Sequence, residues 1–235
     1  MPRTIDLVLT GCGAAAVHWI GHLMVLRAAD VEVANVYAAS SGALVGAAAL
    51  CDIDPAVCLS ALRGMQGKRW LACAMREAMH ALLPPNAHLL CSGKLHVRTT
   101  RAGVPPRSVC TSVYASRAEL LDVLYATTII PFVTAPVLGH ALADGFTHAD
   151  GVVAPNSERR KGVELIALPV SLALASAALP SAEEIDVAVV RGVHAMCSIL
   201  KIDAPKIDYE IALKRGQKGT SLTVLVGTGT ALELV

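Results

Sequence analysis

Four long stretches without a charged residue constrain the fold of this chain more than any other feature. They cover Leu7 to Leu26, Val33 to Cys51, Val123 to Ala143 and Leu165 to Ala182. A membrane-spanning helix needs about 20 mainly apolar residues, but glycine, proline or clustered small polar residues interrupt each stretch. Strands and helices that are buried on both faces of a sheet have the same hydropathy. We therefore expect these stretches to form the core of an α/β protein and not to cross a membrane.

The apolar segments predict strands and helices in alternation. Residues 5–10 are apolar and β-branched and end at a glycine, as a buried strand does. A helix is expected over residues 14–29, a second strand over 31–39 and a second helix over 41–50, which gives a right-handed strand-helix-strand unit. Helix N-caps are predicted at Asp54, Ser116 and Ser181, and further strands over residues 94–100, 107–113, 140–143, 163–169 and 222–226.

Length, charge and cysteine content limit the class of protein. The 235 residues suit a single domain over residues 1–235. The formal net charge of +1 comes without a long basic run, so nucleic acid is not an expected partner. Seven cysteines without Cys-x-x-Cys spacing, and an N-terminus without a signal-peptide pattern, indicate a reducing compartment such as the cytoplasm.

A serine pair stands where the second strand is expected to turn into the second helix. The segment reads Ala38-Ala39-Ser40-Ser41-Gly42. A serine at such a turn is exposed as a nucleophile in proteins with the Gly-x-Ser-x-Gly pattern, because small neighbours let strand and helix approach closely. In this register Ser40 is the nucleophile candidate. The other interpretation is that Ser40 only caps the helix that begins at Ser41.

The turn after the first strand carries Gly11-Cys12-Gly13. Backbone N–H groups in such a turn bind anions, which suits either a dinucleotide pyrophosphate or the oxyanion of a tetrahedral intermediate. A dinucleotide site requires an acid at the end of the second strand, but Asp30 and Glu32 stand at its beginning. The oxyanion hole is therefore favoured, with a plain tight turn as a further interpretation.

Asp144-Gly145 follows the short apolar run of residues 140–143. An aspartate at this position would act as the base that activates Ser40 if the fold brings the two within hydrogen-bond reach. Asp-Gly is also a common turn sequence. A Ser-Asp-His order through His148 or His194 is a further arrangement, although isolated histidines are more often structural.

Together these segments resemble the patatin-like phospholipases, and among them the branch that includes adipose triglyceride lipase. The resemblance rests on the motifs "LTGCGAAAVHWIG", "AASSGALVGA", "NAHLLCSGKLHVRTTR", "ELLDVLYATTIIPFVTAPV" with "ADG", and "DYEIALKRGQKG". It covers residues 5–145 well and the remainder faintly.

The resemblance implies a three-layer α/β/α fold with a mainly parallel sheet and a Ser-Asp dyad that hydrolyses lipid esters without a metal or cofactor. Ser40 matches the nucleophile and Asp144 the base. The oxyanion loop would be Gly11, Cys12 and Gly13, with support for the elbow from Ala38, Gly42 and Gly145. The implied partner is a lipid ester, encountered in the cytoplasm or at the surface of membranes or lipid droplets.

Three positions depart from the family pattern. Ala16 and Ala38 replace glycines, which is tolerable where the backbone φ stays negative. Phe146 replaces a second glycine after Asp-Gly and would strain the loop if its φ were positive. A catalytically impaired relative that binds lipid or a partner protein therefore remains an alternative, as does a dinucleotide-binding protein. The apolar helix expected over residues 71–83 is a candidate lining or lid of the acyl pocket.

Overall fold

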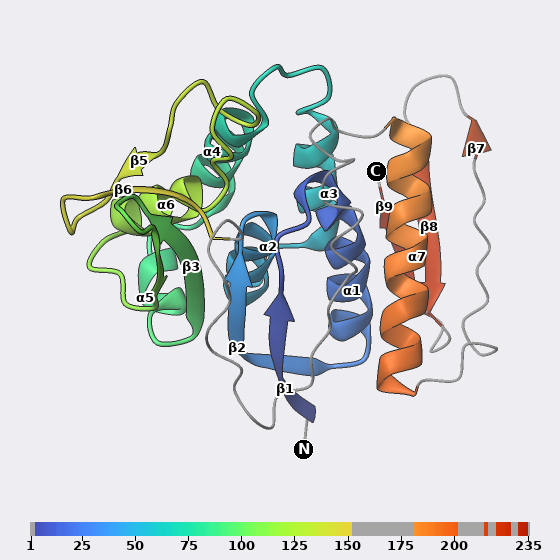
Figure 1. Cartoon of the computed structure of the whole chain (residues 1–235). Helices are drawn as coiled ribbons and strands as arrows, with labels where there is room; N and C mark the ends of the chain where they lie inside the picture. The colour runs from blue at the N-terminus through green and yellow to red at the C-terminus, as the bar shows by residue number, and fades with distance from the viewer. Residues whose placement is uncertain (1–2, 152–180, 202–213, 216–219, 227–229, 235) are drawn as a thin grey trace.

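The structure is a computed structural model that describes residues 3–151, 181–201, 214–215, 220–226 and 230–234. The strand predicted over residues 163–169 lies outside the described residues, as does almost all of the fourth apolar stretch. Seen from the side, the chain places a twisted sheet next to a group of helices (Figure 1).

The main sheet has six strands, and its three longest strands run parallel. β1 (Arg3–Leu9) pairs with β2 (Val31–Ala39), and β2 pairs with β3 (Leu95–Arg101). Three shorter strands extend the sheet in antiparallel fashion: β4 (Arg107–Thr111) and β6 (Thr147–Asp150) pair with β3, and β5 (His140–Ala141) pairs with β6. The open sheet therefore has a parallel centre and an antiparallel border.

β2 and β6 share one edge of β3. β4 occupies the other edge along its length, from Val97 to Arg101. β2 pairs with β3 only as far as Ala39 opposite Arg98, and β6 begins there, with Asp150 opposite Thr99. Because a strand has only two edges for hydrogen bonding, β2 and β6 lie end to end, with their C-terminal ends facing each other.

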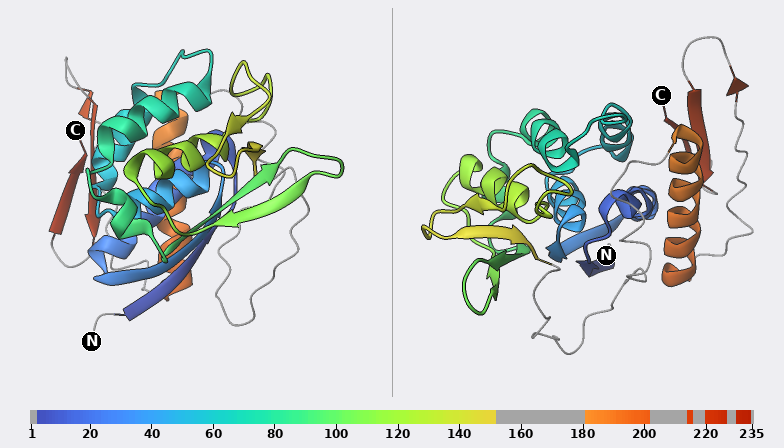
Figure 2. Two further views of the ribbon diagram at one scale, coloured as in Figure 1. Left: turned by 90° about the vertical axis from the view of Figure 1, so that its left-hand side faces the viewer. Right: turned by 45° about the horizontal axis from the view of Figure 1, so that its top comes forward.

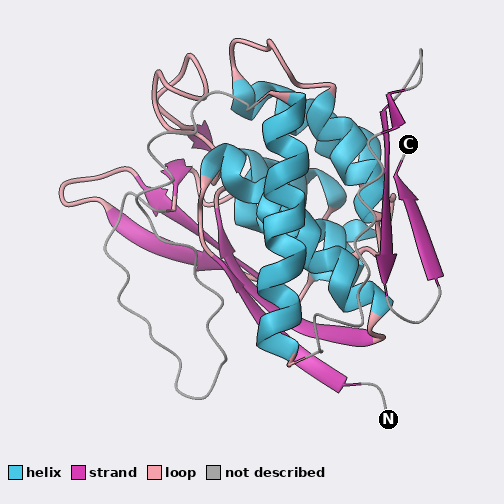
Figure 3. Ribbon diagram, turned by 90° about the vertical axis from the view of Figure 1, so that its right-hand side faces the viewer, coloured by secondary structure: helices cyan, strands magenta, loops and turns pink. Residues whose placement is uncertain are grey.

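The helices begin at the predicted caps. Asp54 Oδ1 accepts a hydrogen bond from the Ala56 N–H, and Ser116 and Ser181 accept from Glu119 and Glu184 at their own helix starts. Most helices lie together beside the sheet (Figure 3). In chain order they are the short 3-10 helix η1 (Gly13–Ala16), α1 (Val17–Ala28), α2 (Ser41–Leu50), α3 (Pro55–Arg63), α4 (Leu71–Leu82), α5 (Ala87–Cys91), α6 (Arg117–Ala126) and α7 (Ala182–Leu200).

α7 packs along α1 on the side away from the sheet (Figure 2). Ile185 and Val189 of α7 are fully buried in a cluster with Val17 and Ile20 of α1. A second, three-stranded antiparallel sheet follows near the C-terminus, made of β7 (Lys214–Arg215), β8 (Thr220–Val226) and β9 (Thr230–Leu234).

The predicted α/β class with an open, mainly parallel central sheet is confirmed, and the helices that flank the sheet are consistent with the patatin-like α/β/α fold. The first three uncharged stretches are each divided between strand, loop and helix. Within the described residues, no helix combines the length and the apolar character that crossing a bilayer requires.

Candidate active site

Ser40 occupies the sharp turn between β2 and α2. Its backbone has φ 53° and ψ −138°, outside the regions that a side chain prefers. Its side chain makes no helix-capping hydrogen bond, so the structure does not support the interpretation of Ser40 as a side-chain N-cap. Such strain persists only where the surrounding structure enforces it, and it concentrates at functional sites. The turn therefore has the geometry that is typical of a nucleophile elbow.

This strain gives the first testable prediction. Both Ser40→Ala and Ser40→Gly remove the hydroxyl, but only glycine adopts a positive φ without steric cost. We expect the glycine variant to be more stable than the alanine variant by about 1 kcal/mol, or about 2 to 4 °C in Tm for a chain of this size. Thermal unfolding of the two variants measures the difference. Equal Tm values would contradict the positive φ at this residue.

The glycine loop lies directly against the elbow. Leu9, the last residue of β1, is level with Ala38 of β2. The Cys12 N–H donates a hydrogen bond to Ser41 Oγ at 3.4 Å. Gly42 permits this approach, because a Cβ at that position would lie 2.3 Å from the Leu9 carbonyl oxygen. The structure thus brings the predicted oxyanion loop and the predicted nucleophile together.

The loop itself is compatible with the two alanine replacements. Gly13 carries the positive φ, 55°, whereas Ala16 has φ −54°. Ala38 has no positive φ either, so the condition for tolerating both alanines is met. Burial raises the pKa of the Cys12 thiol to about 11, against smaller effects from Ser41 and from the Trp19 N–H, which donates to Cys12 Sγ. Cys12 is therefore a neutral thiol at physiological pH and not a competing nucleophile.

Thr127, the fully buried residue at the end of α6, holds the backbone of the Ser40 turn in place. Its hydroxyl accepts a hydrogen bond from the Ser40 N–H at 2.8 Å and donates to the Arg98 carbonyl oxygen at 2.6 Å. The strained residue is thereby tied to β3. Sequence analysis did not identify Thr127, because a single threonine in an apolar segment carries no distinctive pattern.

Asp150 of β6 pairs with Thr99 of β3, and Gly151 after it lies against Arg98, where β2 ends. Asp150 is only 2% exposed, and its N–H donates to the Ile129 carbonyl oxygen. A Cβ on Gly151 would lie 2.2 Å from the Arg98 carbonyl oxygen, which is the atom that receives the Thr127 hydroxyl. The residue after β6 therefore lies against the same backbone oxygen of β3 to which the Thr127 hydroxyl links the Ser40 N–H.

Asp144 lies elsewhere, in the turn between β5 and β6. Its side chain is 40% exposed, and its carboxylate accepts hydrogen bonds from the Phe146 N–H and from His148 Nε2, at 3.0 Å each to the nearer oxygen. Desolvation raises the pKa of Asp144, but these bonds and the Arg101 charge outweigh it, so its pKa is lower than usual. Among the described residues, no hydrogen bond joins Asp144 to Ser40.

The turn around Asp144 is not strained by Phe146. Gly145 adopts the positive φ, 79°, and Phe146 does not. The Phe146 ring instead lies under the Arg101 guanidinium, 4.4 Å from its centroid. The phenylalanine at position 146, where the family pattern has a glycine, therefore causes no backbone strain.

The two histidines considered from the sequence have other surroundings than a catalytic histidine would need. His148 is buried, and both ring nitrogens are engaged, Nδ1 with Thr99 Oγ1 at 2.9 Å and Nε2 with Asp144. His194 is exposed on α7, the helix that packs on the far side of α1. The hydrogen bonds of His148 and the place of His194 both argue against a Ser-His-Asp arrangement.

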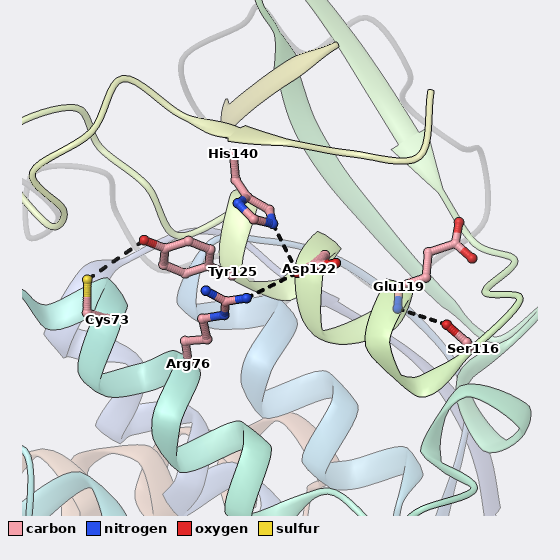
Figure 4. A network of polar contacts seen from close by, with 7 residues as sticks. All are labelled: Cys73, Arg76, Ser116, Glu119, Asp122, Tyr125 and His140. Atoms are coloured by element: carbon pink, nitrogen blue, oxygen red, sulfur yellow. Dashed lines mark hydrogen bonds and ion pairs between the residues drawn. The ribbon is translucent and has the colours of Figure 1, made fainter. Parts of the chain in front are cut away.

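A network of polar contacts anchors the segment that leads to β6 (Figure 4). His140 Nε2 of β5 contacts Asp122 of α6 at 2.9 Å, and Arg76 of α4 contacts the same carboxylate oxygen at 3.4 Å. The Arg76 guanidinium also lies over the Tyr125 ring. These contacts connect β5 to two helices and so fix the base of the hairpin that ends in Asp150.

Asp150 is a further aspartate that the sequence interpretation did not consider. A second Asp-Gly pair, Asp150-Gly151, follows the first by six residues, in "HADG". The signal was therefore present, but the first pair follows an apolar run and the second does not. The pairing of β6 with β3 brings the second pair to Thr99 and Arg98, where β2 ends.

Comparison with curated proteins adds evidence from sequence similarity. Two human relatives are Patatin-like phospholipase domain-containing protein 4, 37% identical over 57 residues, and Patatin-like phospholipase domain-containing protein 5, 27% identical over 143 residues. The human Omega-hydroxyceramide transacylase is 29% identical over 114 residues. The chain is similar to patatin-like phospholipases.

The similarity to the patatin-like phospholipases is partial. The three matches cover 43%, 24% and 54% of this chain, and 21%, 22% and 33% of the transacylase, protein 4 and protein 5, respectively. The chain thus spans between a fifth and a third of the length of these curated relatives. No family model matches the chain.

Proposed function

We propose that the protein is a serine lipid acyl hydrolase that cleaves fatty-acyl esters. The observation that carries this proposal is the meeting of three segments at the C-terminal ends of β1, β2 and β6. They are the glycine loop, the strained Ser40 and the Asp150-Gly151 pair. Ligands of open α/β sheets bind at this end of the strands, and the similarity to patatin-like phospholipases supports an acyl ester as substrate.

In the proposed mechanism, Asp150 is the base and Ser40 the nucleophile. The carboxylate of Asp150 takes the proton of Ser40 as the Oγ atom bonds to the ester carbonyl carbon. The backbone N–H groups of Gly11 and Gly13 stabilise the oxyanion, joined by that of Cys12 when it leaves Ser41 Oγ. The proton passes to the leaving alcohol when the ester bond breaks. A water molecule then gives a proton to Asp150 as its oxygen bonds to the acyl carbon, and Asp150 returns that proton to Ser40 Oγ as the acyl–Oγ bond breaks, which frees the fatty acid and restores both residues.

Asp144, the base expected from the sequence, is the alternative partner of Ser40. It would have to leave its hydrogen bonds to Phe146 and His148 and act from a solvent-exposed turn. The pairing of Asp150 with Thr99, next to Arg98 where β2 ends, supports Asp150 as the nearer base. We therefore prefer Asp150. Action at a membrane or lipid-droplet surface remains a prediction.

Labelling with a fluorophosphonate ester tests the proposal. This probe reacts covalently with activated serines, so we expect stoichiometric labelling of the protein and none of Ser40→Ala. Ser41→Ala is the matched control and should retain labelling. Its rate of labelling should be reduced, because the Ser41 hydroxyl accepts a hydrogen bond from the Cys12 N–H. Absence of labelling in the folded protein would favour a catalytically impaired lipid-binding relative. Stabilisation by NAD(P) without labelling would favour a dinucleotide-binding protein.

A further inference from the structure

An apolar cavity of about 60 Å³ lies between α1, α2, α3 and α4, on the helical side of the sheet. Among the described residues that line it, Ser41 contributes the only side-chain oxygen, and none is charged. Cavities of this composition stay dry and accept apolar ligands. The position and lining of the cavity therefore indicate an apolar guest.

One wall of the cavity belongs to the candidate active site. Ser41 follows the proposed nucleophile in the chain and receives the Cys12 N–H. Ala16, also in the lining, ends the short helix η1 that continues the glycine loop. The cavity therefore begins one residue beyond Ser40, at the start of α2.

The opposite wall is deformable. Met65, Met75 and Met79 line it, and methionine side chains adapt to guests of irregular shape because they are unbranched and flexible. Ala78 and Leu82 of α4 are only partly buried, so the cavity is not sealed from the outside. A chain longer than the resting cavity can thus be accommodated by movement of these side chains.

We propose that this cavity binds the fatty-acyl chain of the substrate, with α4 as its outer wall and as the element that sets acyl-chain length. This inference rests on the proposed function. A polar headgroup does not suit the cavity, because its hydrogen-bonding groups would be buried with a single hydroxyl to pair with. The headgroup instead remains on the solvent side of Ser40.

Narrowing the cavity from α4 tests the proposal. Ala78→Phe places a ring in the cavity, whereas Ala81→Phe places the same ring on the exposed side of the same helix. We expect Ala78→Phe to lower kcat/KM for p-nitrophenyl octanoate relative to p-nitrophenyl acetate by about tenfold or more. Ala81→Phe should leave that ratio unchanged. Equal effects of Ala78→Phe on both esters would contradict the proposal.

A binding measurement separates this proposal from the proposed function. The fluorescent fatty acid cis-parinaric acid is titrated into Ser40→Ala, which lacks the nucleophile but keeps the cavity. We expect saturable binding that Ala78→Phe, added to this background, weakens by about tenfold, and that Ala81→Phe does not. If both phenylalanine variants bind equally well, the cavity is not the acyl site, whatever the labelling of Ser40 shows. If labelling fails but the titration behaves as expected, the acyl site stands without the hydrolase.

Discussion

Asp150→Asn is expected to lower kcat for ester hydrolysis by about a thousandfold, within the range of 10² to 10⁴ typical of a lost general base. The substitution keeps the size and shape of a side chain that is 2% exposed, but an amide cannot take the proton of Ser40. The rate of fluorophosphonate labelling should fall to a similar extent. Steady-state hydrolysis of p-nitrophenyl acetate provides the measurement.

Asp144→Asn is the matched comparison, because it makes the same chemical change in the other Asp-Gly pair. Within the part of the chain that the structure describes, the hydrogen bonds of its carboxylate stay in its own hairpin, near Arg101, so we expect kcat to change by less than about fivefold. The Tm of both variants, measured in parallel, shows whether any loss of activity comes from unfolding. A thousandfold loss in Asp144→Asn, with Asp150→Asn fully active, would reverse the assignment of the base.

Gly42→Ala is expected to reduce both stability and activity. The added methyl group would lie 2.3 Å from the Leu9 carbonyl oxygen and 2.9 Å from that of Thr10, and these backbone atoms cannot rotate away. α2 must then move away from the end of β1. Overpacking of this kind costs about 2 to 3 kcal/mol, or about 4 to 12 °C in Tm. Because the glycine loop leaves β1 at this point, kcat should fall about a hundredfold.

Gly64→Ala serves as the control for this variant. Gly64 caps α3 with φ −65°, and a Cβ there would meet its nearest neighbour at 3.4 Å, an ordinary contact distance. We expect its Tm to remain within about 2 °C of the unsubstituted protein, since alanine also restricts the unfolded chain. Calorimetry on both variants tests the pair. A Gly42→Ala protein as stable as Gly64→Ala would mean that the elbow does not approach β1 as closely as described.

Local sequence patterns predicted the first half of the fold well. The strand over residues 31–39 and the helix over 41–50 have the predicted bounds, because a β-branched run that ends in small residues determines both. The caps at Asp54, Ser116 and Ser181 are confirmed for a similar reason, since each cap depends on a side chain within three residues of the backbone that it binds. Ser40 and the glycine loop were found because strand, turn and helix follow one another directly.

Tertiary pairing determined what the sequence could not predict. β6, "THAD", has neither alternating hydrophobicity nor β-branched enrichment, and it is a strand because β3 offers a free edge beyond the end of β2. Asp150, the last residue of this strand, was therefore not among the candidates from the sequence. Thr127 binds a backbone group 87 residues away, and no spacing rule reaches so far. Asp144 was predicted from the apolar residues that precede it. This is a local property of the sequence and does not determine the distance between Asp144 and Ser40.

β6 pairs with β3 directly beyond the end of β2. The position of Asp150 therefore does not depend on the length of the chain that leads to β6. β3 sets where β6 stops, so residues inserted into or removed from the connection between α6 and β5 would not shift Asp150 along β3. Homologues could therefore vary this connection freely while the end of β6 keeps its place at the end of β2.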